Sequence, residues 1–480
     1  MDLITTKLLS AAGGGGGRGD EAWVARYYGR VGTGKYTEPS GIVADSNGVY
    51  ISGRSNDVDG AYGQNSYNGF WFKLSSDGTQ IDWFKTSEEN NFYHHLMSAN
   101  SALMPNGNIV FAGYIKNGTH NARGVLYQIN PTNGNVVWRT LFDGYDYNDP
   151  KSVKVDSNNN IFVSGWTGSN SQGGYGTGNV WKFDANHGNL WRRYYGSLTA
   201  TFTGSVETWA EMAWCDVDSN GDVYFSGSVV ENQPISAQHR PSHVVKLNSS
   251  GVEQWKRKIY GSSSGTEHVK PFTLNPTNNG LLYYAAMYKD NNGNSEWVIV
   301  YLNASTGATS GYQRTTFYGT DSITIKDMYV DPNTRDIWIL AMTTASYRIY
   351  IYKLDSNFTL QWANGITVDS SVKLTTNADT PMPGMFLDSD ENLYFNTVGY
   401  ADKNHVFKIP TTGLVAGTYG AYTITDESST WNIDNSNFTL NNVSAVIASP
   451  STAASGTPGN NGIAYHDSTT HTYDAHTELY

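Results

Sequence analysis

The feature of this chain that most limits its fold is a unit that recurs seven times along the sequence. Each unit begins with a polar Asn/Asp/Gly cluster and a short run of aliphatic and aromatic residues, as in DSNGVYISG (45–53). A second segment resembling KLSSDG (73–78) follows, and an aromatic residue closes the unit. We expect the closing side chains to pack between neighbouring units, because aromatic rings dominate buried area. The closing residues are Trp83, Trp138, Trp191, Trp255, Tyr312, Trp362 and Tyr419.

Each unit predicts four short strands, because its β-branched and aromatic runs are separated by residues that form tight turns. Four-stranded sheets repeated around an axis form a β-propeller, which usually has about four to eight blades. The predicted fold class is therefore an all-β, seven-bladed β-propeller of four-stranded antiparallel blades, spanning residues 23–424. We expect residues 1–22 to be an extended, flexible, Gly-rich N-terminal arm. We expect residues 425–480 to form a C-terminal hairpin, a linker and a polar tail that make assembly contacts.

The sequence leaves two alternatives for the closure of the ring. The segment WVARYYG (23–29) resembles WRRYYG of the third unit, so it is an eighth copy of the fourth strand. In the first alternative Trp23, Tyr27 and Tyr28 complete the last blade from the N-terminal side, and residues 417–424 lead outward. In the second alternative residues 417–424 close their own blade, and the N-terminal strand pairs elsewhere.

The stretch DVDSNGDVYFSG (216–227) has the spacing of a calcium-binding EF-hand loop over its first seven positions. Such a loop requires a bidentate Glu at its twelfth position, where this chain has Gly227. It also lies between helices, whereas a short aromatic and β-branched run follows here. We therefore interpret these residues as the hairpin turn of the fourth blade, and we predict no metal site.

Several units share a pattern close to Lys-Leu-x-x-x-x-Gly-x-x-x-Trp. KLSSDGTQIDW (73–83) has three residues before the Gly and four after it, and KLNSSGVEQW (246–255) has three and three. This pattern resembles the repeats of quinoprotein dehydrogenases and of related bacterial propellers. The resemblance implies the blade architecture over roughly residues 23–424. Quinoproteins have eight blades and a funnel of charged cofactor ligands, often with an adjacent disulfide. Because this chain has seven units and one cysteine, we expect no cofactor.

The ends of the chain resemble those of virion structural proteins of tailed bacteriophages, particularly tail and fibre components. The start contains five consecutive glycines, the end is rich in Ser, Thr and Asn, and the β repeats are poor in cysteine. The resemblance implies a non-enzymatic virion protein that is synthesised in the host cytoplasm. Its propeller would be a platform docked to other virion proteins through the terminal segments, with host surface glycans as further candidate partners. The alternatives are a carbohydrate-active or redox propeller enzyme and a glycan-binding lectin.

Composition narrows the range of partners. The chain has 31 basic and 43 acidic residues and a net charge of −12, which argues against nucleic-acid binding. No apolar run approaches the length of a membrane span, so we expect no membrane insertion. The first 17 residues make a poor signal peptide, because Asp2 lies where positive charge is expected and Lys7 interrupts the apolar stretch.

Other candidate sites have structural interpretations that we favour. Glu207 and Glu211 fall on the same face of a predicted inner strand, among tryptophans that would raise the pKa of an acid, but no second catalytic carboxylate can be assigned. Cys215 lies in an apolar strand and is interpreted as a core residue. The tripeptide Arg18-Gly19-Asp20 and three histidines of the C-terminal tail are interpreted as solvated segments. These histidines are His466, His471 and His476. We therefore predict no catalytic, cofactor-binding or metal residue.

Overall fold

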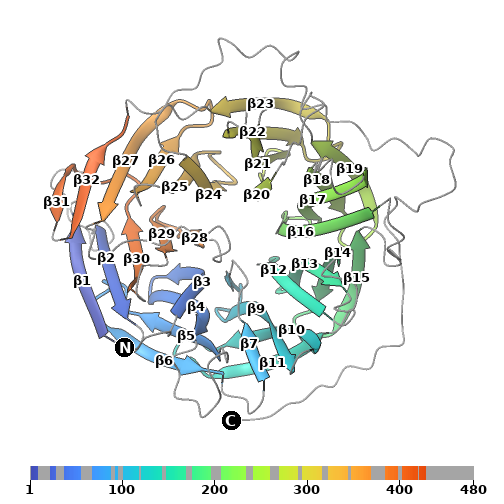
Figure 1. Cartoon of the computed structure of the whole chain (residues 1–480), viewed down its shortest axis with the longest axis horizontal. Helices are drawn as coiled ribbons and strands as arrows, with labels where there is room; N and C mark the ends of the chain where they lie inside the picture. The colour runs from blue at the N-terminus through green and yellow to red at the C-terminus, as the bar shows by residue number, and fades with distance from the viewer. Residues whose placement is uncertain are drawn as a thin grey trace, which may run out of the picture.

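The computed structural model shows an all-β ring of seven blades arranged around a central axis (Figure 1). The described part of the chain contains no helix, and hence none that is long and apolar enough to cross a membrane. The predicted fold class is confirmed. The structure describes residues 2–8, 22–28, 37–55, 68–87, 92–95, 101–117, 120–142, 147–168, 176–195, 207–233, 242–259, 270–289, 295–315, 323–343, 348–368, 384–397, 403–419 and 421–428.

Strands follow one another from the axis to the rim in the first five blades. Blade one contains β3 (Thr37–Asp45), β4 (Gly48–Ser55), β5 (Asn68–Leu74) and β6 (Ile81–Thr86). Blade two contains β7 (Phe92–His95) and β8 (Ser101–Leu103), both paired with β9 (Ile109–Asn117), then β10 (His120–Ile129) and β11 (Val136–Phe142). Blade three contains β12 (Tyr147–Val155), β13 (Ile161–Gly168), β14 (Gly176–Phe183) and β15 (Asn189–Tyr195). Blade four contains β16 (Glu207–Val217), β17 (Val223–Gln233), β18 (Ser242–Leu247) and β19 (Glu253–Ile259). Blade five contains β20 (Lys270–Pro276), β21 (Leu281–Lys289), β22 (Ser295–Asn303) and β23 (Thr309–Thr315).

The last two blades carry additional strands at their outer edges. Blade six contains β24 (Ile323–Val330), β25 (Ile337–Thr343), β26 (Arg348–Leu354) and β27 (Leu360–Val368), and is extended by β32 (Tyr422–Asp426) and β31 (Gly417–Tyr419). Blade seven contains β28 (Met385–Leu387), β29 (Leu393–Thr397), β30 (Lys403–Ile409) and β2 (Ala22–Tyr28), and is extended by β1 (Asp2–Leu8).

The N-terminal strand β2 completes blade seven. It pairs with β30, with Trp23 opposite Lys408, Tyr27 opposite Asn404 and Tyr28 opposite Lys403. The assignment of Tyr419 as the closing aromatic residue of this blade is therefore wrong. Tyr419 lies in β31, which is separated from β27 of blade six by β32. The N-terminal strand takes this place because β2 pairs with β30, whereas β31 pairs with β32.

The terminal segments differ in part from the expected arm and tail. Asp2–Leu8 form β1, which pairs along its whole length with β2, so this part of the segment is a strand at the edge of a sheet. The first residues of the expected C-terminal region complete β32, which ends at Asp426, and the structure describes the chain as far as Ser428. The predicted hairpin, linker and polar tail lie beyond it, outside the described residues.

Tryptophans at the start of the fourth strands fasten neighbouring blades together. The indole N–H of Trp255 in blade four donates to Ala304 O in the outer turn of blade five, at 3.0 Å. The same bond leads from Trp23 to Ser76, Trp83 to Pro131, Trp191 to Ser249 and Trp362 to Thr411. Because Trp23 of blade seven contacts blade one, this series also closes the ring. Trp138 differs, since its ring lies 3.7 Å from the ring of His187 of blade three.

The glycine of the repeated pattern is required by this contact. Gly307 has a φ of +67°, a conformation that favours glycine, and it lies on the face of the Trp255 ring. A Cβ atom there would lie 2.7 Å from the indole. The same arrangement joins Gly78 with Trp23, Gly134 with Trp83, Gly251 with Trp191 and Gly413 with Trp362. Within one blade, the Gly thus contacts the Trp of the preceding blade, whereas the Trp contacts the outer turn of the following blade.

Blade five corrects a second predicted closing residue. Gly311 of β23 occupies the position that Trp255 occupies in β19, since Gly311 pairs with Tyr301 of the third strand. Tyr312 therefore lies one residue beyond that position. A shift of one residue along a strand turns a side chain to the opposite face. The Tyr301 ring lies over Gly311 and contacts Phe358 of blade six, at 5.8 Å between ring centroids. An aromatic residue of the third strand therefore fills this junction.

The stretch that resembles a calcium loop is the turn between β16 and β17. Asp218 Oδ1 accepts the backbone N–H groups of Asn220 and Asp222 at 2.9 and 3.1 Å, and Oδ2 accepts the Tyr224 hydroxyl at 2.9 Å. Lys246 pairs with Asp222 at 2.9 Å. The carboxylates of this turn are thus used to cap the hairpin, in the manner of an Asx turn.

Candidate functional site

Charged and polar residues meet at the central hub, on the innermost strands. The innermost strand of every blade has one equivalent position, which is defined by its pairing with the second strand. It is occupied by Lys154 in blade three, Asp216 in blade four, Asn275 in blade five and Tyr329 in blade six. In blades one, two and seven it is occupied by Val43, Ala102 and Phe386. The hub is therefore polar on one side and apolar on the other.

A bulge in each of the four polar strands precedes this position. The register shifts between Pro150 and Ser152 in β12, Met212 and Trp214 in β16, Pro271 and Thr273 in β20, and Ile325 and Asp327 in β24. A bulge adds one residue to one strand and changes the direction of the side chains that follow. Asp327, the first paired residue after its bulge, is brought to the hub in this way.

Lys154 and Asp216 form an ion pair between blades three and four. The Lys154 ammonium donates to Asp216 Oδ2 at 3.3 Å, and Asp216 Oδ1 also accepts the N–H of Val217 at 2.8 Å. Burial raises the pKa of Asp216, although the Lys154 charge opposes this effect. Burial likewise disfavours the ammonium, but the charges of Asp216, Cys215 and Asp327 outweigh it and raise the pKa of Lys154. Each charge thus depends on the other for its stability in the hub.

Asp327 is the most strongly perturbed acid in the hub. It is 6% exposed, and its carboxylate accepts the backbone N–H of Met328 at 2.8 Å. Burial raises its pKa to about 7, against the opposing effects of the Met328 N–H and of Lys154. Among the described residues no cation forms an ion pair with Asp327 within 4.0 Å. Near neutral pH this carboxyl group exchanges a proton, which is the property required of a general acid or base.

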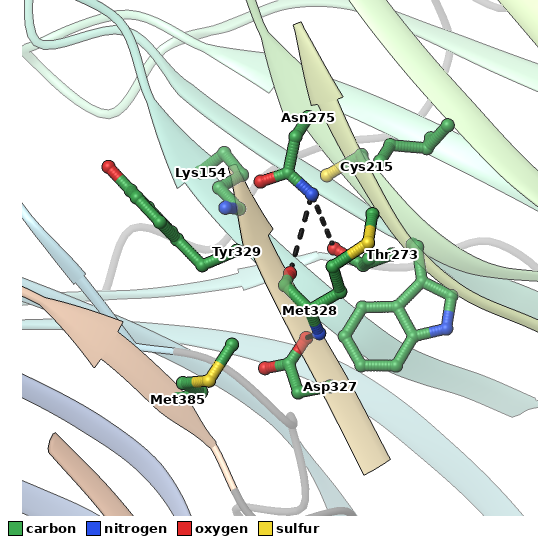
Figure 2. A pocket seen from close by; sticks show the side chains of 10 residues that line it. Lys154, Cys215, Thr273, Asn275, Asp327, Met328, Tyr329 and Met385 are labelled. Carbon is green, nitrogen blue, oxygen red and sulfur yellow. Dashed lines mark hydrogen bonds between the residues drawn. The ribbon is translucent and has the colours of Figure 1, made fainter. Parts of the chain in front are cut away.

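A small cavity lies between these groups (Figure 2). Its volume is about 30 Å³, enough for about two water molecules. Asn275 crosses one wall, where it donates to Thr273 Oγ1 at 3.1 Å and to Met328 O at 3.3 Å. The charged groups that line the cavity are Lys154 and Asp327. The cavity therefore has space for water between a cationic and an acidic side chain.

The residues singled out from the sequence occupy different places. Glu207 and Glu211 lie in β16, and their side chains are outside the described part of the structure. Cys215 is 2% exposed, with its sulfur 3.7 Å from Ser152 Oγ, and burial raises the pKa of the thiol, as in a core residue. The Arg-Gly-Asp tripeptide and the three tail histidines lie outside the described residues. Within the described ranges, no group of three or more His, Cys, Asp or Glu residues could hold a metal ion.

The hub residues were missed by the sequence analysis, although a signal for them exists. Lys154, Asp216 and Tyr329 each stand two residues before the aspartate that begins a turn. Val43 and Phe386 occupy the same place in blades with an apolar hub. A repeat is recognised by the residues that its units share, whereas these candidate residues lie where the units differ.

Comparisons with known proteins identify neither a family nor a close relative. No family model and no curated protein matches the chain. Solved structures similar to it include the polysaccharide lyase Uly1, at 11% identity and a TM-score of 0.47, covering 85% of this chain and 99% of the other. They also include a quinohemoprotein alcohol dehydrogenase from Comamonas testosteroni (10%, TM-score 0.42, 82% and 77%). A third is a Penicillium chrysogenum α-L-arabinanase complexed with arabinobiose (10%, TM-score 0.40, 66% and 94%).

These similarities correct one expectation from the sequence. The prediction that the chain is not an enzyme is wrong in excluding an activity, because the similar structures include a lyase, a dehydrogenase and an arabinanase. At 10 to 11% identity they carry no information on a reaction or a substrate of this chain.

Proposed function

We propose that this chain is a structural component of a tailed-bacteriophage virion, in which the propeller is a rigid platform and the terminal segments attach it to neighbouring virion proteins. The observation that carries the proposal is the position of the two ends. β1 is the outermost strand of blade seven and β31 is the outermost strand of blade six. The ends of β1 and β31 come close together at the rim (Figure 1). The described strands nearest the two ends of the chain are therefore neighbours at one place on the rim.

The C-terminal extension is firmly held where it leaves the propeller. β32 pairs with β27 from Asn364 to Val368, and the N–H of Glu427 donates to Ala363 O at 3.0 Å. Glu427 is 5% exposed and forms an ion pair with Arg348. A buried pair of this kind is costly to break, because each partner would leave a charge without compensation. A load applied to residues beyond Ser428 would therefore be transmitted to blade six.

The sequence of the terminal segments supports the same role. Residues 429–480 are rich in Ser, Thr, Asn and Gly, and the N-terminal segment contains five consecutive glycines. Segments of this composition cannot bury a core of their own, but they form large contact areas when they order on a partner. The tyrosine-containing segments 60–69 and 171–178 of the sequence are candidate contacts for subunits or for host glycans.

Mass spectrometry of purified particles of the phage that encodes this chain tests the proposal. We expect the full chain at a fixed copy number relative to other virion proteins. A chain that ends at Ser428 should fold but be lost from the particles, whereas the matched substitution Asp82→Asn at the outer edge of blade one should be incorporated normally. Absence of the full chain from intact particles would reject the proposal.

A second candidate function is acid–base chemistry at the hub, as in a carbohydrate-active enzyme. It is favoured by Asp327, whose pKa is raised to about 7 beside the Lys154–Asp216 pair. Turnover of a polysaccharide by the purified protein, lost on Asp327→Asn and retained on Asp82→Asn, would support it. No turnover across a panel of neutral and acidic polysaccharides would leave the virion role as the better account.

A further inference from the structure

We propose that the hub is a hydrated proton-binding site, in which ordered water links the Lys154 ammonium to the Asp327 carboxyl group and a proton held on Asp327 stabilises the folded ring. The site joins blades three and six, which are not neighbours in the ring. The proposal does not depend on the virion role, and it shares Asp327 with the enzymatic alternative.

The geometry of the cavity carries the inference. Lys154 and Asp327 both line a space of about 30 Å³ without forming an ion pair with each other (Figure 2). A buried water requires about two to four polar partners, and the lining also includes Thr273 and Asn275. A cavity with these partners is filled by water, whereas apolar cavities of similar size stay empty.

The surroundings of Asp327 favour its protonated form. The adjoining strand β16 contributes the carboxylate of Asp216 and the thiol of Cys215, and β12 contributes Lys154, whose charge is already paired with Asp216. On β24 itself Tyr329 lines the cavity with Asp327, and Lys326 directly precedes Asp327 in the chain. β20 and β28 contribute only uncharged side chains to the cavity, such as Asn275 and Met385. Protonation of Asp327 therefore removes a negative charge that Lys154, which is already paired with Asp216, does not neutralise.

The direction of the pH effect follows from these contacts. An unfolded Asp has a pKa of about 3.9, whereas burial raises the pKa of Asp327 to about 7. Between these values the folded state holds a proton that the unfolded state has lost. Stability from this group is complete below about pH 4 and is lost as the pH rises through about 7. Within this window the unfolding equilibrium constant should rise by up to about tenfold per pH unit.

Urea unfolding of the full chain from pH 4.5 to 8.5 tests the site. We expect Asp327→Asn to reduce the pH dependence by one proton relative to the unsubstituted protein. The matched control Asp82→Asn, in an ion pair with Lys73 at the rim, should keep the original dependence. An unchanged pH dependence in Asp327→Asn would overturn the proposal.

High-resolution structures of the unsubstituted protein at pH 5.5 and 8.5 provide a second measurement that does not depend on the folding of a variant. We expect a water within hydrogen-bond distance of both Lys154 Nζ and the Asp327 carboxyl group at the lower pH. A dry cavity, or a direct contact between Lys154 and Asp327 at both pH values, would also overturn the proposal.

Discussion

The two sides of the hub are made of equivalent strands but have opposite chemistry. Val43 and Phe386, from blades one and seven, belong to an apolar cluster that includes Tyr50 and Trp71. Lys154 and Asp216 occupy the equivalent positions of blades three and four and form an ion pair. The backbone pairing that places these residues is the same on both sides. The comparison shows that the repeat determines where a hub side chain lies but not what it is.

The two sides of the hub also contribute differently to the stability of the folded protein. An apolar hub gains free energy from burial at no electrostatic cost. A buried ion pair is at best weakly stabilising, and an unpaired carboxyl group such as Asp327 is destabilising when ionised. Residues with strongly perturbed pKa values gather at functional sites, so blades three to six are the side on which to look for function.

A charge placed on the apolar side should have the largest effect. Val43 is fully buried, and Val43→Asp would leave a carboxylate without a cation partner. We expect a loss of more than about 4 kcal/mol in the free energy of unfolding, measured by urea denaturation at pH 7. Val43→Thr, with a similar volume and no charge, is the control and should lose much less. If both variants are equally stable, the apolar side is not packed as described.

Removal of the cation on the polar side should have the next largest effect. Lys154→Met leaves Asp216 without its partner, and we expect a loss of about 3 kcal/mol at pH 7, reduced by the partial exposure of Lys154. Because the Lys154 charge lowers the pKa of Asp327, its loss should also move the pH dependence of stability to higher pH. The control is Lys256→Met, which removes a longer, partly exposed ion pair with Glu253 (3.7 Å) in the outermost strand of blade four and should lose less than about 1 kcal/mol. Equal losses in the two variants would contradict the special role of the hub.

Neutralisation of Asp327 should stabilise the protein at alkaline pH. We expect Asp327→Asn to gain roughly 2 kcal/mol at pH 8, since one pKa unit corresponds to about 1.4 kcal/mol and the amide loses part of the gain. At pH 5, where Asp327 is protonated in the fold, the gain should disappear. Thermal unfolding at both pH values measures the difference. A gain of the same size at pH 5 would show that it does not come from ionisation.

Changes at the rim should have the same small effect on both sides. Trp83→Phe in blade one and Trp255→Phe in blade four each remove an indole N–H donor that is bonded to the next blade, at 3.1 and 3.0 Å. We expect a loss of about 1 kcal/mol in each case, measured by urea unfolding. A loss several times greater on one side would mean that the asymmetry extends beyond the hub.

Sequence reasoning recovered the blades because the information for them is local. Each hairpin is specified by its own Asn, Asp and Gly residues, as Asp218 shows by capping the turn of blade four. The alternation within a strand and the Gly-to-Trp spacing then repeat with each unit. Because this spacing repeats, five of the seven predicted closing residues occupy the equivalent position at the start of the fourth strand. They are Trp83, Trp138, Trp191, Trp255 and Trp362.

The candidate site was not recovered because its contacts are distant in the chain. Lys154 and Asp216 are 62 residues apart, and they meet only because adjacent blades bring their innermost strands together at the axis. The raised pKa of Asp327 depends on burial by side chains from other blades, which no local pattern records. The closing role of Trp23 required a choice between two ends that carry similar strands.

The number of blades, the order of their strands and the hairpin turns follow from the sequence alone, because each of these depends on residues within one unit. The end that closes the ring, the replacement of an aromatic residue by Gly311 in blade five and the charged side of the hub are visible only in the folded ring. These features depend on the register and curvature of the complete ring. They are contacts between different units, and residues that are far apart in the sequence become neighbours only when the ring closes.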